Sequence, residues 1–266
     1  FVILRFKHFI LSAVLILTSL SFVSAQETSD KKPNGTPKPV ESAKGVTAEQ
    51  VVETTILLYG TRDNLKQIRK SVFERGKISI TNAEGRVEQA NYERWILRGD
   101  SLDKERIRFD QEFPNAKFSL VYKDNKIFGI FNDSVFQPRE DAAKAFENQI
   151  WHGLEALLRY KENGSTIELV GKEKLMGVEF HLLDVTDKQN RKTRFFISAK
   201  QFRVMILEYT EDGIKYKRKF YNYNYAQGTL FPYYTILWAD GKQIEETTVQ
   251  TITFGQRVQE DLFQGS

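Results

Sequence analysis

The chain has 266 residues, of which 41% are hydrophobic and 28% are charged, proportions that are ordinary for a globular protein. Its formal net charge is +4, and basic stretches such as 215–219 alternate with aromatic residues, so we do not expect a nucleic-acid-binding surface. The absence of cysteine excludes disulfides, thiol nucleophiles, cysteine-ligated metals and lipid attached to cysteine. Three histidines do not favour a histidine-based metal site, so we expect no metal and no cofactor.

The first 25 residues have the three parts of a secretory signal peptide. A positively charged start precedes an apolar run over residues 10–20, and small residues follow up to Ala25, with cleavage expected before Gln26. The run is shorter than the about 20 apolar residues that span a bilayer. Residues 1–25 therefore favour a removable export signal over the alternative, an uncleaved membrane anchor.

Residues 26–45 contain three prolines and two glycines and almost no apolar side chain. Such a composition cannot bury enough surface to offset the entropy of ordering the chain, so it predicts a flexible linker. The remaining residues, 46–266, have the length of one large β domain.

This domain is expected to begin with helix and to continue with strands. Thr47 can cap a helix over 48–59, and a second turn or short helix covers 62–68. Alternating apolar residues between turn signals then predict strands, with the clearest hairpins at the Asp-Gly pairs 212–213 and 240–241. The predicted strands lie near 69–81, 86–98, 104–113, 116–123, 126–132, 165–174, 177–186, 191–198, 202–210, 214–226, 231–239 and 242–254.

One long helix, from Arg139 to Lys161, interrupts the strands. Pro138 lies just before it, where a helix start tolerates proline, and Asn163-Gly164 suits its end. Its apolar residues fall on a single stripe with helical period, which comprises Phe146, Ile150, Leu154, Leu157 and Leu158. An amphipathic helix in the middle of a long series of strands must bury this stripe against their concave face, so we interpret it as a lid.

Together these elements predict a mainly β fold of about eleven strands, with an N-terminal helix and a central amphipathic helix. Short connections make sequence neighbours pair, which gives an antiparallel up-and-down sheet. Such a sheet cannot stay flat, because twist accumulates, and should curl into a barrel or into a half-barrel covered by the helices. Periodicity leaves two interpretations open. Either the helix and the sheet enclose an apolar cavity for an acyl chain, or they fill each other as a dry core.

Several segments follow one another in a familiar order along residues 46–263. After the first helix come the aromatic-basic block YERWILRGDSLDKERIRFD, the hairpin FSLVYKDNKIFGIFN, the central helix, the hairpin FFISAKQFRVMILEYTEDG and the closing segment ITFGQRVQEDLF. This order, behind a signal peptide, resembles the bacterial outer-membrane lipoprotein-sorting family, the LolA/LolB-like periplasmic half-barrels. The resemblance implies a LolA-like incomplete barrel that encloses the acyl chains of lipoproteins during passage across the periplasm.

The resemblance also implies which residues form the site. The apolar ligand-binding candidates, for which the inward parity of each strand stays open, are Trp95, Phe118, Phe146, Ile150, Leu154, Leu158, Phe180, Phe196, Ile206 and Phe220. The family's carrier uses an arginine to hold its lid shut, and Arg98 is the nearest match. Gly99 stands where the family has proline after that arginine, so the other interpretation is a strand-end arginine that pairs with a surface acid.

With no cysteine to carry lipid, a soluble periplasmic carrier fits better than a membrane-anchored acceptor. Its partners would be lipoprotein or lipid acyl chains, together with inner- and outer-membrane sorting proteins. The alternative is a sensor or scaffold module of the same fold that binds a membrane partner. We expect no enzyme, because no G-x-S-x-G occurs, and the pair His152 and Glu155 lacks a second histidine on its helix. His152 is expected on the lid surface or at an interface.

Overall fold

The computed structural model describes residues 45–82 and 84–264. The predicted signal peptide, 1–25, and all but the last residue of the predicted linker, 26–45, lie outside the described residues. Within the described ranges, no helix is both long and apolar enough to cross a membrane.

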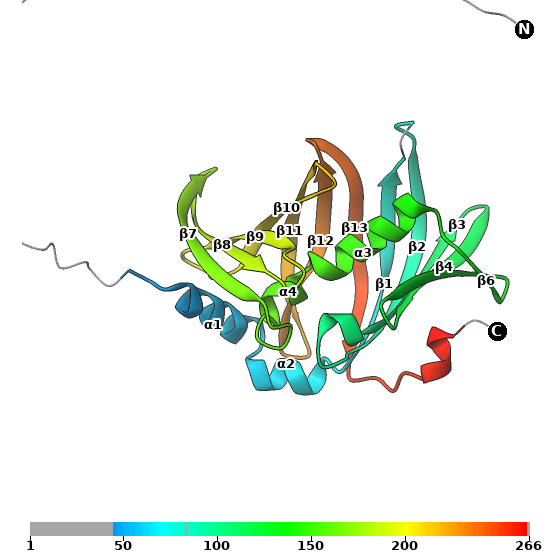
Figure 1. The fold of residues 1–266 in the computed structure, drawn as a ribbon, viewed down its shortest axis with the longest axis horizontal. Helices are drawn as coiled ribbons and strands as arrows, with labels where there is room; N and C mark the ends of the chain where they lie inside the picture. Colours follow the sequence, from blue (N-terminus) through cyan, green and yellow to red (C-terminus); the bar gives the residue numbers. More distant parts are fainter. Residues whose placement is uncertain (1–44, 83, 265–266) are drawn as a thin grey trace, which may run out of the picture. The chain divides into compact units, whose positions relative to one another are not determined.

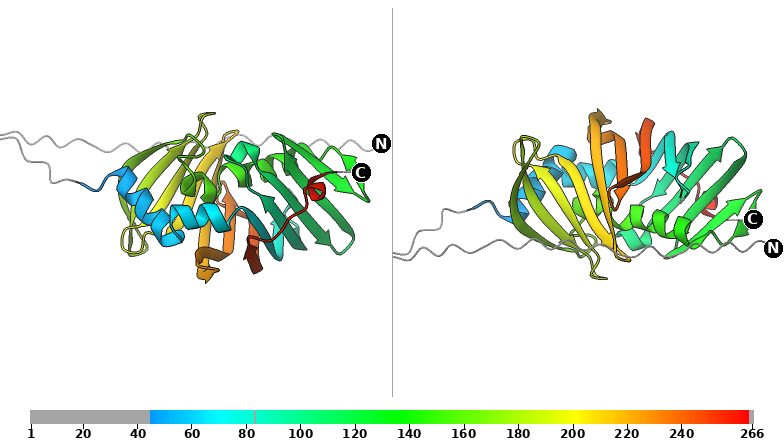
Figure 2. Two further views of the ribbon diagram at one scale, coloured as in Figure 1. Left: turned by 90° about the horizontal axis from the view of Figure 1, so that it is seen from below. Right: turned by 90° about the horizontal axis from the view of Figure 1, so that it is seen from above.

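Thirteen strands form one antiparallel sheet in the order β6-β5-β4-β3-β2-β1-β13-β12-β11-β10-β9-β8-β7 (Figure 1). They are β1 (Ser71–Thr81), β2 (Val87–Leu97), β3 (Arg106–Phe113), β4 (Ala116–Lys123), β5 (Lys126–Phe131), β6 (Ser134–Phe136), β7 (Thr166–Leu175), β8 (Val178–Thr186), β9 (Lys192–Ser198), β10 (Val204–Glu211), β11 (Ile214–Ala226), β12 (Thr229–Ala239) and β13 (Lys242–Phe254). The sheet curls without closing into a barrel, as Figure 2 shows from below and from above. The predicted fold class is confirmed. The strand count was too low because β6, with three residues, is too short to show alternation.

The N-terminal helices form where the sequence predicts them, at α1 (Ala48–Tyr59) and α2 (Arg62–Ile68). Thr47 begins α1 with a capping box, in which its hydroxyl accepts a hydrogen bond from the Gln50 amide at 3.2 Å. One face of α1 is fully buried because Val51, Val52, Ile56 and Tyr59 point into the core.

The segment between β6 and β7 covers one face of the sheet. These strands are consecutive in the sequence but lie at opposite edges of the sheet, so their connection must cross it (Figure 1). The predicted single helix over 139–161 is two helices, α3 (Glu140–Trp151) and α4 (Leu154–Leu158). The break falls at Gly153, which has extended backbone angles and begins α4, because glycine disfavours the interior of a helix. We call α3 and α4 together the lid.

Two apolar clusters fix the lid on the sheet. On α3, Phe146 and Ile150 pack against β2, β3 and β4 through Tyr92, Phe109 and Leu120. The second cluster joins α4 to α1 and to the other half of the sheet, and its buried members include Leu157, Leu158, Val52, Leu183, Phe195 and Leu207. We call this face of the sheet the inner face, and the opposite one the outer face. Two short 3₁₀ helices, Leu102–Lys104 and Glu260–Phe263, complete the described structure.

Gly76 sits at a bulge in β1, where the strand pairs with β13 at the centre of the sheet. A Cβ at this position would lie 2.0 Å from the carbonyl oxygen of Thr248, so β13 would have to shift. We expect Gly76→Ala to lower the free energy of unfolding by about 2 kcal/mol, the range of overpacked cores. Gly45→Ala is the control, because a Cβ there meets no atom within 4 Å. Equal urea-unfolding midpoints for the two variants would contradict this expectation.

Candidate functional site

A cavity of about 180 Å³ lies between the lid and the inner face of the sheet. Phe146 and Ile150 of α3 line it, with Leu154 of α4 and Phe220 of β11. Pockets for small ligands usually measure about 300–1,000 Å³. In this state the lid and the sheet therefore fill most of the space between them, and a ligand of ordinary size would need the lid to move.

Six of the ten predicted ligand-binding residues lie on the inner side of the molecule. Phe146, Ile150, Leu154 and Phe220 reach the cavity, whereas Leu158 is buried beside it in the cluster with α1. Phe118 lies further along, on the inner face of β4.

The structure does not bring the other four to the cavity, because they point to the outer face. Trp95 packs on Phe73 with 4.2 Å between ring centroids, and it joins a cluster around the C-terminal Phe263. Phe180 and Phe196 contact each other edge to face, and Ile206 pairs with Phe196 on the next strand. Alternation gives the period of a strand but not its phase, and these strands carry apolar residues on both faces.

An apolar groove opens at the start of α3. It measures about 420 Å³ and runs between β4, β5, β6 and the first turn of the lid. Phe118 and Leu120 form its floor, and these two residues also belong to the cluster under α3. Phe131 and Phe136 stand at its rim and are 47% and 36% exposed. Exposed aromatic rings beside an apolar groove are typical of a binding site.

A buried group of charges lies beneath α4, at the other end of the cavity. We call Arg69, Arg98, Glu105, Glu155 and Arg159 the arginine cluster. Arg98 contacts Glu105 at 2.9 Å and Glu155 at 3.1 Å. Arg69 also pairs with Glu155, and Arg159 with Glu105. Burial by itself would raise the pKa of Glu155, but Arg69 and Arg98 outweigh it and lower that pKa.

Arg98, the predicted latch, thus extends from the end of β2 to a carboxylate on the lid. The prediction missed its partners, because Arg69, Glu105 and Glu155 lie far apart in a sequence rich in charged residues. No motif marks them, and only the folded chain brings them together.

A second polar network joins α3 to the middle of the sheet. Gln149 of the lid accepts a hydrogen bond from Arg94 at 2.9 Å and donates one to Glu245 at 3.1 Å. Glu245 pairs with Arg218 at 2.8 Å, and Glu74 accepts a hydrogen bond from the Tyr92 hydroxyl at 2.6 Å. The middle of the cavity is therefore lined by polar side chains as well as apolar ones.

His152, at the junction of α3 and α4, is buried. Of the two expected positions, the lid surface was wrong, because His152 lies between the lid and the strands β9 and β10. Its Nδ1 lies 2.6 Å from the Thr193 hydroxyl, and its ring stacks on Tyr209 at 3.9 Å. Its Nε2 has no hydrogen-bond partner among the described residues, although a Glu211 oxygen lies 3.8 Å away. Burial lowers the pKa of His152 to about 4, against an opposing effect of Glu211.

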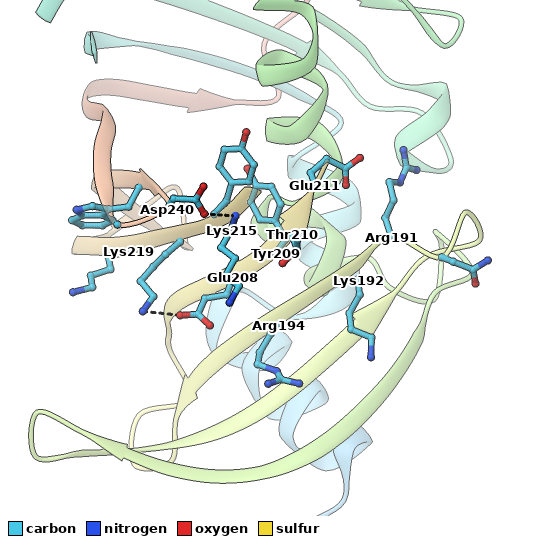
Figure 3. A pocket seen from close by; sticks show the side chains of 15 residues that line it. Arg191, Lys192, Arg194, Glu208, Tyr209, Thr210, Glu211, Lys215, Lys219 and Asp240 are labelled. Carbon is cyan, nitrogen blue, oxygen red and sulfur yellow. Dashed lines mark hydrogen bonds and ion pairs between the residues drawn. The ribbon is translucent and has the colours of Figure 1, made fainter. Parts of the chain in front are cut away.

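The outer face of β9 to β12 carries a larger groove of about 860 Å³ (Figure 3). Six basic and three acidic side chains line it. Lys217 pairs with Glu208 at 2.7 Å, whereas Lys219 lies over the ring of Trp238 at 5.2 Å. Neither Lys215 nor Lys219 forms an ion pair within the part of the chain that the structure describes. Across residues 45–82 and 84–264, no group of His, Asp or Glu is arranged to hold a metal ion.

The buried His152 makes the stability of the fold depend on pH. Its pKa is about 6.5 when unfolded and about 4 when folded. Below pH 6.5 His152 becomes protonated in the unfolded chain but stays neutral in the folded chain. The free energy of unfolding therefore falls as the pH drops from about 6.5 to about 4. We expect a loss of about 3 kcal/mol from this residue. Thermal melts of wild type and His152→Asn should converge as the pH falls through this range. Parallel pH profiles would contradict the assignment.

No protein-family model and no curated protein matches this sequence. Solved structures do match. A DUF1329 family protein from Desulfovibrio piger has a TM-score of 0.61 and 11% identity, over 83% of this chain and 98% of that one. The LolA superfamily protein NE2245 from Nitrosomonas europaea has a TM-score of 0.58 and 12% identity, over 83% and 98%. A domain from Vibrio parahaemolyticus, described as an outer-membrane lipoprotein-sorting protein, has a TM-score of 0.51 and 12% identity, over 82% and 95%. The described chain therefore has a LolA-like fold.

Proposed function

We propose that this protein is a carrier that binds the acyl chains of lipoproteins or lipids between the lid and the inner face of the sheet. The observation that carries the proposal is the continuous apolar surface from the groove at Phe136 to the cavity beside Phe146. Burial of an acyl chain contributes about 0.8 kcal/mol per methylene. The LolA-like fold supports this proposal, as does the likeness to a domain described as lipoprotein-sorting.

Uptake requires the lid to separate from the sheet, because the closed cavity is small. Polar contacts hold the lid on the sheet along its length. Lys144 and Gln149 hold α3, and His152 bonds to Thr193 at the junction. Glu155 holds α4 through Arg69 and Arg98. Arg98 is then the latch, since its pairing with Glu155 is made only when α4 is down. A break in the helix at Gly153 lets the two halves of the lid move separately.

The setting of this activity is the periplasm, to which the segment 1–25 would direct export without lipidation. Delivery towards the outer membrane would involve inner- and outer-membrane sorting proteins as partners. The proposed role is binding and transfer, with no catalytic step.

The carrier proposal is tested by what the protein holds after purification. The chain is expressed with its N-terminal segment, purified from the periplasmic fraction without detergent, extracted with organic solvent and analysed by mass spectrometry. We expect acyl lipid or acylated protein in stoichiometric amount. A protein that is reproducibly free of acyl ligand, and that takes none up from vesicles, would refute the carrier.

Two lid residues separate ligand binding from stability. Leu154 is half-buried and lines the cavity, whereas Leu157 is fully buried in the core. We expect Leu154→Glu to weaken binding of a fluorescent acyl-chain probe at least tenfold with a small change in melting temperature. Leu157→Ala should instead lower stability by about 2–5 kcal/mol and leave the binding of the folded fraction intact. If Leu154→Glu unfolds the domain, the stripe is a dry core instead.

A second candidate is a sensor or scaffold module that binds a membrane partner. The outer groove favours it, because six basic side chains line it against three acidic ones and suit an acidic protein segment. A photoreactive residue at position 219 should cross-link one membrane protein in cells. That product should disappear with Lys215→Glu and persist with Lys172→Glu, at a lysine remote from the groove. Cross-linking that ignores Lys215→Glu would count against this candidate.

A further inference from the structure

The charges that line the cavity balance only while the lid is in place, with four arginines against four glutamates, one of which is Glu155 of α4. The network at the middle of the sheet sets two arginines, Arg94 and Arg218, against two glutamates, Glu74 and Glu245. The arginine cluster under α4 sets three arginines against two glutamates. Arg159 does not line the cavity, so at this end Arg69 and Arg98 face Glu105 and Glu155, and the balance depends on the glutamate of the lid.

The arginine cluster also has donors left over. Arg69 and Arg98 both line the cavity, and their side chains are only 9% and 10% exposed. The Nε of each is buried and has no hydrogen-bond partner among the described residues. The Glu155 Oε1 that faces both arginines also has no hydrogen-bond partner of good geometry among the described residues. Because buried donors in native proteins are nearly always satisfied, the open donors indicate that Glu155 fits the two arginines poorly as their acceptor. Burial lowers the pKa of Arg69 in spite of Glu155, whereas Glu105 and Glu155 outweigh burial and raise the pKa of Arg98.

The members of the arginine cluster come from two parts of the structure, the sheet and the lid. Arg69 follows α2, Arg98 follows β2 and Glu105 precedes β3, so these three belong to the sheet side. Glu155 lies on α4, and Arg159 is its C-terminal cap. When α4 moves off, Arg69 and Arg98 are left with Glu105 alone. If an apolar ligand then keeps water from them, an unpaired charge there is strongly unfavourable.

We propose that Glu155 occupies the position of a ligand's anionic headgroup, and that the cargo is an acyl amphiphile whose phosphate or carboxylate pairs with Arg69 and Arg98 once α4 has moved. This inference rests on the carrier function proposed above and names the class of its ligand. Guanidinium groups bind such oxyanions with two parallel hydrogen bonds, a geometry that uses the free Nε donors.

An apolar route leads away from the arginine cluster, beside the polar network at Gln149. From the arginine cluster, the cavity passes Leu154, Ile150 and Phe146 before the inner face reaches the apolar groove beside Phe118. When the headgroup is bound at the arginine cluster, the acyl chain lies under α3 and extends towards the apolar groove. A neutral or zwitterionic headgroup would leave the arginines uncompensated, so the site discriminates by charge.

Three amphiphiles with the same alkyl chain test this inference: dodecyl phosphate, dodecanoate and dodecylphosphocholine, each titrated calorimetrically below its micelle concentration into the delipidated full chain. We expect dodecyl phosphate, dodecanoate or both to bind at least tenfold more tightly than dodecylphosphocholine. The preferred anion shows whether the headgroup is a phosphate or a carboxylate.

Variants locate the preference. Glu155→Gln keeps the shape of the side chain but removes the competing charge, so we expect about tenfold tighter binding of the preferred anion and unchanged binding of dodecylphosphocholine. Glu140→Gln is the matched control, since Glu140 is exposed in the first turn of α3. Replacing Lys215 and Lys219 together by Gln should leave the preference intact, because they lie in the outer groove.

The possible outcomes distinguish a failure of the headgroup assignment from a failure of the carrier function. Equal affinity for all three amphiphiles overturns the headgroup assignment and leaves the carrier standing, whereas no binding of any amphiphile overturns the carrier itself. A preference that disappears with the two outer lysines also overturns the assignment. The comparison of the three amphiphiles uses the wild-type protein, so it tests the headgroup assignment even if Glu155→Gln does not fold.

Discussion

The constraint on which this structure depends is the position of β6 and β7 at opposite edges of one sheet. A flat sheet of thirteen strands would be about 57 Å wide at about 4.8 Å between strands. The twelve residues of α3 span only about 18 Å. Because the sheet curls and brings its edges closer, the connection can cross with its loops unextended and lay both helices on the inner face.

The covered face is not uniform, and its variation follows the helices that lie on it. Beneath α3, aromatic side chains of β2, β3 and β4 make an oily surface. Beneath α4, arginines at the ends of α2 and β2 face a glutamate of the lid. Buried charges lower the stability of a fold unless they are paired. The apolar clusters already form a core, so the packing of the core does not by itself explain the charges beneath α4. In the proposed carrier, the apolar part of the inner face would bind the acyl chain and the arginines would bind its negative charge.

Much of the fold could be predicted from the sequence because its signals are local. The Asp-Gly turns, the capping Thr47 and the alternation of the strands place most elements within two residues of their bounds. The strand phase could not be predicted, because Trp95, Phe180, Phe196 and Ile206 lie in strands that are apolar on both faces. A bulge between Val204 and Ile206 shifts the phase again. The partners of Arg98 stayed hidden because only long-range folding joins Glu105 to Glu155.

Because the lid is also the crossover from β6 to β7, the chain attaches it at both ends, and it cannot swing open about one end alone. Before α3 the chain has three residues, 137–139, and after α4 it has seven, 159–165, between helix and strand. Fully extended, these stretches reach about 10 Å and about 23 Å. The extended reach is therefore about twice as great on the α4 side, where the arginine cluster lies. In the proposed carrier, a ligand would displace α4 further than α3, and the length of residues 159–165 would limit how thick a ligand fits beneath it.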